Sequence, residues 1–314
     1  MSRPVNANGV QMAFVPSGEQ FEISSGAQRA VIVEVGGGVR EYDVAGRAVL
    51  DSYPSSAICD GAHGTPLIPW PNRLDRGRYS FGGRDLQLTL SEPARGNAIH
   101  GLLRWRPWRA LERERDRVVM GARLLPEPGY PFALELTIAY ELGDAGLTVT
   151  TIARNHGDDD CPYGAGQHPY LSPGRGQIDD CTLELAAATR ILTDPERAVP
   201  VGREPVAGTP FDFRDARALG AQALDCGFTD LTAGAGEPVA RLAGDDGAVV
   251  ELSLDEHYPF VQLYSGDTLA PERRRLGLAV EPMTCASNAF RSGDGLVALR
   301  AGEAHECRWS VRLR

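Results

Sequence analysis

The alternation of apolar and polar residues along this chain has the period of β-strands. From Phe132 to Leu142, apolar side chains occupy every second position, with Ala, Glu and Thr between them. The same alternation occurs at 86–90, at 250–254 and at 307–313, close to the C-terminus. Because successive side chains of a strand point to opposite faces, each segment predicts a strand with one face in a core. We expect the last of them to pair within a sheet.

Turns rather than helices separate these predicted strands. The chain has 36 glycines and 22 prolines, which are the residues that most often mark turns. Only residues 212–224 have the loose apolar spacing of a short helix. The helices that alternate with strands in a parallel sheet are missing. The sequence therefore predicts an all-β fold, a large antiparallel β-sandwich that forms a single domain over residues 1–314.

The charge and the cysteines limit the possible partners. A net charge of −10 argues against a general nucleic-acid surface, which needs a basic face, and against an anionic membrane. A pocket can still be locally basic, so anionic small substrates stay possible. The N-terminus has no apolar core of a signal peptide, and the six scattered cysteines include no C-x-x-C pair. We expect a cytoplasmic protein, monomeric or homodimeric, that acts on a small molecule.

Two segments far apart in the chain carry groups suited to moving protons. His168 precedes Pro169, which favours extended geometry, so its imidazole can project from a strand end into a cleft. Glu281 follows the apolar run 278–280 and precedes Pro282, so we expect partial burial that raises its pKa toward that of a useful base. On opposite sides of a polar substrate, the pair can move two protons without a metal or nucleotide. Alternatively, Glu281 serves as a structural cap or forms an ion pair.

Four other polar residues are candidates for contact with a substrate. Arg73 follows two prolines, so its guanidinium can donate from a rigid loop to hydroxyls or an oxyanion, or else form a surface ion pair. His100 can donate to a ring or hydroxyl oxygen, or serve as a structural group. Asp225 and Asp230 can accept hydrogen bonds from sugar hydroxyls, although loop aspartates often do no more than stabilise turns.

Several motifs of other enzyme classes are incomplete. The glycines at 36–38 lack the lysine and threonine of a phosphate loop. His305 has no second histidine four residues on, and the chain has no Gly-x-Ser-x-Gly. His63, His100 and His168 are too widely separated to give a metal-ligand spacing. The sequence predicts neither a metal nor a cofactor.

Taken in order, several short motifs resemble those of the aldose 1-epimerase (galactose mutarotase) family. The motifs lie at 71–74, 77–83, 97–101, 166–171, 224–228 and 281–284. The likeness extends from about residue 20 to the C-terminus. Its specificity comes from the recurrence of the motifs in a fixed order, because each is short.

The resemblance implies a fold, a reaction and a set of site residues. The fold is a large antiparallel β-supersandwich with a cleft across its concave face. The reaction interconverts the α and β anomers of an aldose without a cofactor, with His168 as general acid and Glu281 as general base. The residues carried over as sugar contacts are Arg73, His100 and Asp225. We add Asp230 and Tyr170 as further candidates for substrate binding.

Departures from the family pattern leave the sugar open. Pro282 and Met283 stand before Thr284, where Thr-Gln more commonly follows the glutamate, and Leu102 replaces a second glycine. One alternative is a non-catalytic carbohydrate-binding protein on the same fold. Another is an epimerase of a phosphorylated or sulfonated hexose. The arginines that could hold such an anion are Arg73, Arg76, Arg78, Arg104 and Arg106. A glycoside hydrolase would instead need two carboxylates that flank the bond.

Overall fold

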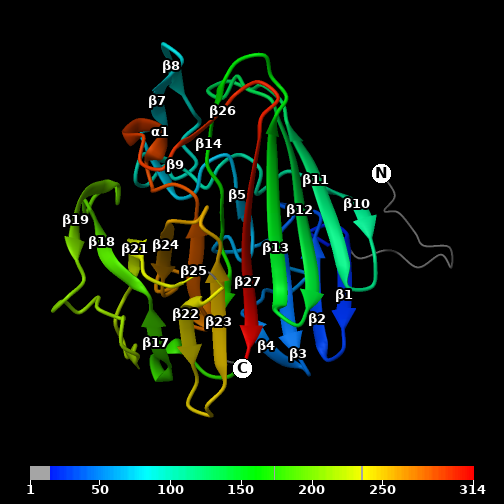
Figure 1. Cartoon of the computed structure of the whole chain (residues 1–314), viewed down its shortest axis with the longest axis vertical. Coiled ribbons are helices and arrows are strands. Elements are labelled where there is room, and N and C mark those ends of the chain that lie inside the picture. The colour runs from blue at the N-terminus through cyan, green and yellow to red at the C-terminus, as the bar shows by residue number, and fades with distance from the viewer. Residues whose placement is uncertain (1–14, 173, 235) are drawn as a thin grey trace.

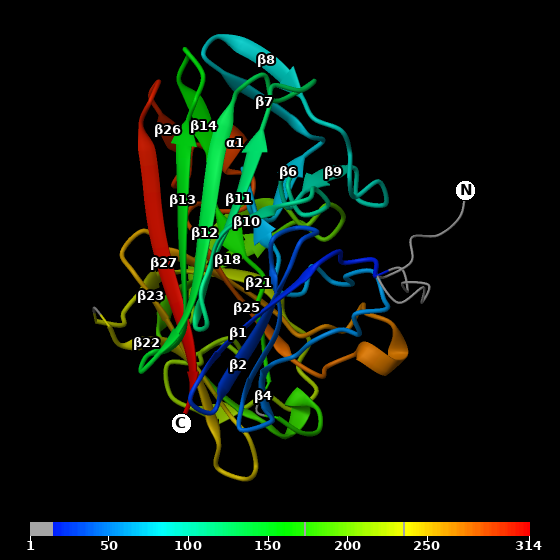
Figure 2. The same cartoon turned by 90° about the vertical axis from the view of Figure 1, so that its right-hand side faces the viewer.

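The structure is a computed structural model that describes residues 15–172, 174–234 and 236–314. Two large antiparallel sheets face each other in this part of the chain (Figures 1 and 2). Within the described residues, the first sheet contains, in this order, β1 (Gln20–Ser25), β2 (Gln28–Val33), β3 (Val39–Val44), β4 (Arg47–Leu50), β16 (Tyr170–Leu171), β25 (Leu278–Met283), β24 (Phe260–Tyr264), β21 (Asp225–Leu231), β18 (Ala187–Thr193) and β19 (Pro200–Pro205). In addition, β15 (Gly166–Gln167) pairs with β25 on one side and with β5 (Pro66–Leu67) on the other. The predicted antiparallel β-sandwich is confirmed.

The second sheet contains the longest strands. It is formed, in this order, by β10 (Arg109–Arg113), β11 (Arg117–Leu124), β12 (Leu134–Gly143), β13 (Gly146–Asn155), β27 (Ala304–Leu313), β23 (Val249–Leu254), β22 (Pro238–Ala243), β17 (Thr182–Leu185) and β20 (Arg217–Ala218). In β12, buried positions alternate with half-buried or exposed ones, as the sequence predicts. The C-terminal strand β27 pairs with β13 on one side and with β23 on the other. The predicted strands at 250–254 and 307–313 are thus confirmed.

Short elements cover one end of the sandwich (Figure 1). They are the strand pairs β14 (Cys161–Tyr163) with β26 (Val297–Leu299), β6 (Arg73–Asp75) with β9 (Asn97–Ile99) and β7 (Arg78–Phe81) with β8 (Arg84–Gln87), together with the helix α1 (Ala289–Ser292). Two 3₁₀ turns, η1 (Ile178–Asp180) and η2 (Pro271–Arg273), lie in connections. No described helix is long and apolar enough to cross a membrane.

Two of the predicted elements differ from the structure. The helix expected at 212–224 is wrong: β20 pairs there with β17, and the Leu219 N–H donates to the Cys181 carbonyl at 2.9 Å. This pairing within a sheet outweighs a weak helical spacing. The strand expected at 86–90 ends at Gln87, and Leu90 is 42% exposed.

The core lies between the two sheets and anchors the motif that contains His168. Tyr140, Trp309 and Phe228 are fully buried there, and each such side chain contributes roughly 1.5–3 kcal/mol of hydrophobic stabilisation. Gln167 crosses this core: it donates to the Tyr140 hydroxyl at 2.9 Å and accepts from Trp309 Nε1 at 3.3 Å. Because neighbouring side chains of an extended segment point to opposite faces, His168 is directed away from the second sheet.

Candidate active site

A cavity of about 450 Å³ lies against the first sheet, on the face that is turned away from the second sheet. Its size is in the range of small-molecule sites. Most of the side chains that line it are polar or charged. The predicted residues that line it are Arg73, His100, His168, Asp225 and Glu281.

Neighbouring strands bring these side chains to one face. Glu281 of β25 lies opposite Gln262 of β24, and Asp225 at the start of β21 lies opposite Tyr264. On these strands the side chains of alternate residues share a face. Val280, adjacent to Glu281, therefore packs in the core between the sheets.

His168 and Glu281 are in direct contact. His168 Nε2 lies 3.3 Å from Glu281 Oε1, and the two side chains are 5% and 2% exposed. The two groups are therefore in contact, and not on opposite sides of a space for a substrate as the sequence predicts. Glu281 and the apolar run 278–280 both lie within β25. His168 Nδ1 and Glu281 Oε2 have no hydrogen-bond partner among the described residues, so each can make a further bond.

Burial shifts the pKa values of this pair in opposite directions. It is the main cause that lowers the pKa of His168 below its usual 6.5, and the charge of His63 acts in the same direction. Burial also raises the pKa of Glu281 well above 4.5; Asp225 adds to the shift and Arg73 opposes it. Both shifts disfavour charge. The pair therefore favours a state with one proton, shared across the 3.3 Å contact.

Arg73 and Asp225 hold each other at the cavity wall. Arg73 starts β6, and its Nε donates to both carboxylate oxygens of Glu92 at 3.1 and 3.2 Å. Its Nη1 lies 3.5 Å from Asp225 Oδ2, while Gln262 donates to Asp225 Oδ1 at 2.7 Å. Arg73 thus forms ion pairs, as one of the two interpretations of its sequence position predicts, but these pairs lie at the cavity wall and not on the outer surface. These bonds fix both groups before a ligand arrives.

His100 and Tyr170 both pack against His168. The His100 ring meets the His168 ring edge-on, with centroids 5.4 Å apart, and its backbone is left-handed at φ 61°. Burial lowers the pKa of His100 well below 6.5, so this ring is neutral near pH 7. Tyr170 stacks on His168 at 5.0 Å and donates its hydroxyl to the Gly61 carbonyl at 2.8 Å. Tyr170 therefore lies behind His168 and is not among the residues that line the cavity.

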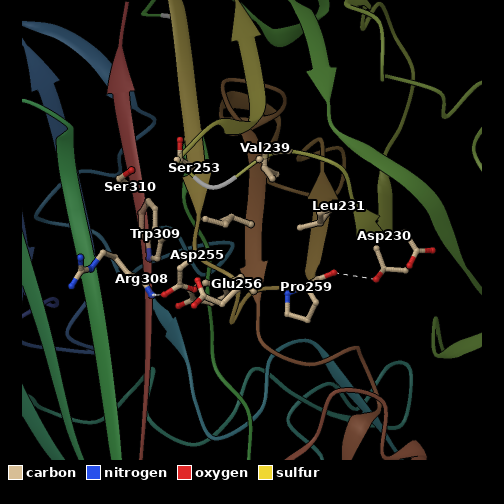
Figure 3. Close-up of a pocket in the computed structure, with 16 residues that line it drawn as sticks. Asp230, Leu231, Val239, Ser253, Asp255, Glu256, Pro259, Arg308, Trp309 and Ser310 are labelled. Atoms are coloured by element: carbon tan, nitrogen blue, oxygen red, sulfur yellow. Dashed lines mark hydrogen bonds between the residues drawn. The ribbon is translucent and has the colours of Figure 1, made fainter.

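Asp230 is not brought to this site. It lines a different hollow of about 590 Å³, together with Trp309 and Ser310 of the second sheet (Figure 3). The reason is the strand period: Asp225 and Asp230 are five residues apart on β21, so their side chains point to opposite faces of the sheet.

The arginines named as possible anion-binding residues do not all lie at this cavity. Arg104 lines the cavity, and its guanidinium lies over the exposed ring of Trp105 at 5.1 Å. Arg76 and Arg78 line another hollow. Arg106 is exposed and pairs with Glu127 at 2.8 Å.

Further polar residues of the site were missed from the sequence, among them Glu92, Gln262 and Tyr264. Glu92 and Tyr264 line the cavity, and Gln262 orients Asp225. The apolar–polar alternation of β24 is a signal that could have placed Gln262 and Tyr264 on one face. Glu92 lies in a loop with no such pattern. No group of three or more His, Cys, Asp or Glu side chains that could hold a metal occurs in the described part of the chain.

Comparisons with known proteins place the chain in a family. The sequence model of the family described as aldose 1-epimerase matches residues 19–312. The chain belongs to the aldose 1-epimerase family. The uncharacterized protein YihR of Escherichia coli K12 is 33% identical over 94% of this chain and 93% of its own length. The aldose 1-epimerase of the same organism is 28% identical over 74% of this chain and 70% of its length.

Solved structures of low sequence identity share the fold of this aldose epimerase. A homologue of GalM and aldose epimerase from C. elegans has a TM-score of 0.83 at 19% identity, over 94% of this chain and 98% of its own. Galactose 1-epimerase from Lactobacillus acidophilus NCFM has a TM-score of 0.78 at 19% identity, over 93% of each chain. The recognised family and the galactose mutarotase-like fold are confirmed. The protein is an isomerase of the epimerase class, and its family implies a small sugar substrate.

Proposed function

We propose that this protein interconverts the α and β anomers of a hexose, with His168 and Glu281 as the groups that move protons. The observation that carries the proposal is the buried 3.3 Å contact between His168 Nε2 and Glu281 Oε1 at the wall of a cavity that suits a sugar. The ring oxygen and the anomeric hydroxyl of an aldose are bonded to the same carbon. Two groups that serve these oxygens must therefore lie close together, as these two do.

The reaction requires only one proton shared between His168 and Glu281. Carboxylate Glu281 takes the proton of the anomeric hydroxyl, while protonated His168 gives its proton to the ring oxygen. The bond between the anomeric carbon and the ring oxygen breaks, and an aldehyde forms. Rotation about the first carbon–carbon bond presents the other face of the carbonyl. The ring hydroxyl then attacks this face, His168 takes back its proton, and Glu281 returns one to the new anomeric hydroxyl.

The buried environment suits this shared proton. In the free enzyme, burial favours the neutral carboxylic acid and the neutral imidazole, as the directions of both pKa shifts indicate. Transfer of the proton across the contact gives the ionic form that begins the reaction. Arg73 Nη1 and the edge of neutral His100 supply polar groups beside the sugar oxygens. Asp225, fixed by Arg73 and Gln262, accepts from ring hydroxyls and retains the open chain.

Polarimetry tests this proposal against a non-catalytic sugar-binding protein. A freshly dissolved single anomer changes its optical rotation slowly in buffer. We expect the protein to accelerate this change for at least one aldose. If it binds an aldose but accelerates no aldose tested, the binding protein on the same fold is the better description.

One observation favours a second candidate, an epimerase of a phosphorylated or sulfonated hexose. Arg104 lines the cavity, and no described carboxylate lies within 4.0 Å of its guanidinium. Burial lowers the pKa of Arg104, so its charge lacks full solvation. An anionic substituent would neutralise it with charge-assisted hydrogen bonds. Exchange NMR across glucose, galactose, a 6-phosphate and a 6-sulfonate tests this, because a preference for the anionic sugars supports it and equal rates oppose it.

A further inference from the structure

A stack of three aromatic rings lies behind the proposed catalytic pair. The Tyr170 ring lies between His63, at a centroid distance of 3.8 Å and an angle of 10°, and His168, at 5.0 Å and 21°. The backbone beside His63 also holds His168: the Gly64 N–H donates to the His168 carbonyl at 2.8 Å, and the His168 N–H donates to the Thr65 carbonyl at 3.1 Å. The position of His168 thus depends on segment 63–65 through both its ring and its backbone.

The outer ring of the stack is fixed by polar contacts. His63 Nδ1 lies 2.7 Å from the Asp60 carbonyl, and Nε2 lies 2.9 Å from Asp51 Oδ2. Arg273 donates to the same Asp51 oxygen at 2.9 Å, and the His63 side chain is 1% exposed. Arg273 Nη2 also lies 3.2 Å from His63 Nε2, so both ring nitrogens have polar neighbours that hold the ring in one orientation.

We propose that His63 is a positioning residue, which fixes the Tyr170 ring and thereby the imidazole of His168. The inference rests on the proposed function, since it matters only if His168 moves protons. His63 is not among the residues that line the cavity, so it acts through Tyr170 rather than on the sugar. Such supporting contacts hold a reactive group within the narrow range of orientations that proton transfer requires.

His63 also acts on His168 through its charge. The titratable and charged groups that face His63 are Asp51, Asp60, Arg273, Tyr53, Cys59 and Tyr170. After burial, the charge of His63 is the next largest cause that lowers the pKa of His168. A neutral ring in place of His63 should therefore raise the pKa of His168. The acid limb of the activity profile would move to higher pH, which a merely structural role would not produce.

The substitution His63→Phe tests the inference, because phenylalanine keeps a flat ring for the stack and removes the hydrogen bonds and the charge. We expect kcat for anomer exchange to fall by about 10- to 100-fold, with KM within roughly twofold of its original value. NMR titration of His168 in the ligand-free protein should show a higher pKa than in the unmodified protein. His156→Phe is the control, since His156 is 52% exposed and pairs with Glu135 on β12.

The outcomes separate this inference from the proposed function. An unchanged kcat and an unchanged titration of His168 in folded His63→Phe would overturn the inference. If that variant does not fold, Asp51→Asn takes its place. A loss of kcat of about 10-fold, together with shifted His168 ring resonances, supports the role, and no change in either measurement overturns it. If the unmodified protein accelerates no aldose, the proposed function fails, while the ligand-free titration still decides whether His63 controls His168.

Discussion

Replacing Glu281 by glutamine removes the proposed base with little disturbance of the site. Glutamine has nearly the same shape, and its amide can still meet His168 Nε2 across the 3.3 Å contact. The pKa of Glu281 is raised by burial, so the side chain is already largely neutral in the free enzyme. We therefore expect the free energy of unfolding to change by no more than about 1 kcal/mol.

The effect on catalysis should be much larger than the effect on stability. An amide cannot take the proton of the anomeric hydroxyl, so the contribution of one general base is lost. That contribution is about 10²- to 10⁴-fold in rate, or roughly 3–5 kcal/mol of transition-state stabilisation. His168 and Arg73 remain in place, so a small acceleration over buffer should survive.

Polarimetry at equal concentrations of folded protein measures this loss. Asp230→Asn is the matched control, because it is also a carboxylate-to-amide change but lies in the other hollow (Figure 3). We expect Asp230→Asn to keep the activity of the unmodified protein. The reasoning is refuted if Glu281→Gln retains activity within about threefold of the original, or if both variants lose it equally.

The buried pair, Arg104 and the Gln167 bridge can each be tested separately. The kcat/KM profile should have its acid limb, where His168 takes up a proton, below pH 6.5, and its basic limb, where Glu281 loses its proton, well above pH 4.5. An acid limb at or above 6.5, or a basic limb near 4.5, would contradict the shared proton. Arg104→Met should lower kcat/KM for a hexose 6-phosphate or 6-sulfonate by about 10- to 100-fold and leave kcat/KM for glucose unchanged. Exchange NMR measures both values. Equal losses for the anionic and the neutral sugar would count against an anion site. Gln167→Leu leaves the buried Tyr140 hydroxyl and Trp309 Nε1 without their hydrogen-bond partner. Urea denaturation should therefore show that the free energy of unfolding falls by roughly 2–4 kcal/mol. A decrease of less than about 1 kcal/mol would be inconsistent with the buried bridge.

The strand pattern could be predicted from the sequence because one face of each strand is buried. The alternation at 132–142 and 307–313 reports this burial directly. The helix expected at 212–224 failed because pairing of β20 with β17 is a long-range contact that local spacing does not encode. For the same reason, the family motifs and not any periodicity assigned His168 and Glu281 to one site, and their direct contact was not predicted.

The site itself could be predicted only in part. Strand parity could already have separated Asp225 from Asp230, since five residues place them on opposite faces. The direct contact of His168 with Glu281 depends on how β15 and β25 come together, which no single segment reveals. His63 gave no signal beyond its residue type, because its role depends on a ring stack and on Asp51 and Arg273 from other parts of the chain.

Anomer exchange measured by NMR on an aldose with ¹⁸O at its anomeric hydroxyl tests the central claim most directly. If His168 and Glu281 open and close the ring, the α and β signals should exchange faster than in buffer while the label stays on the sugar. Both His168→Asn and Glu281→Gln should abolish most of this acceleration. No acceleration by the unmodified protein, or loss of the label at each interconversion, would contradict the claim.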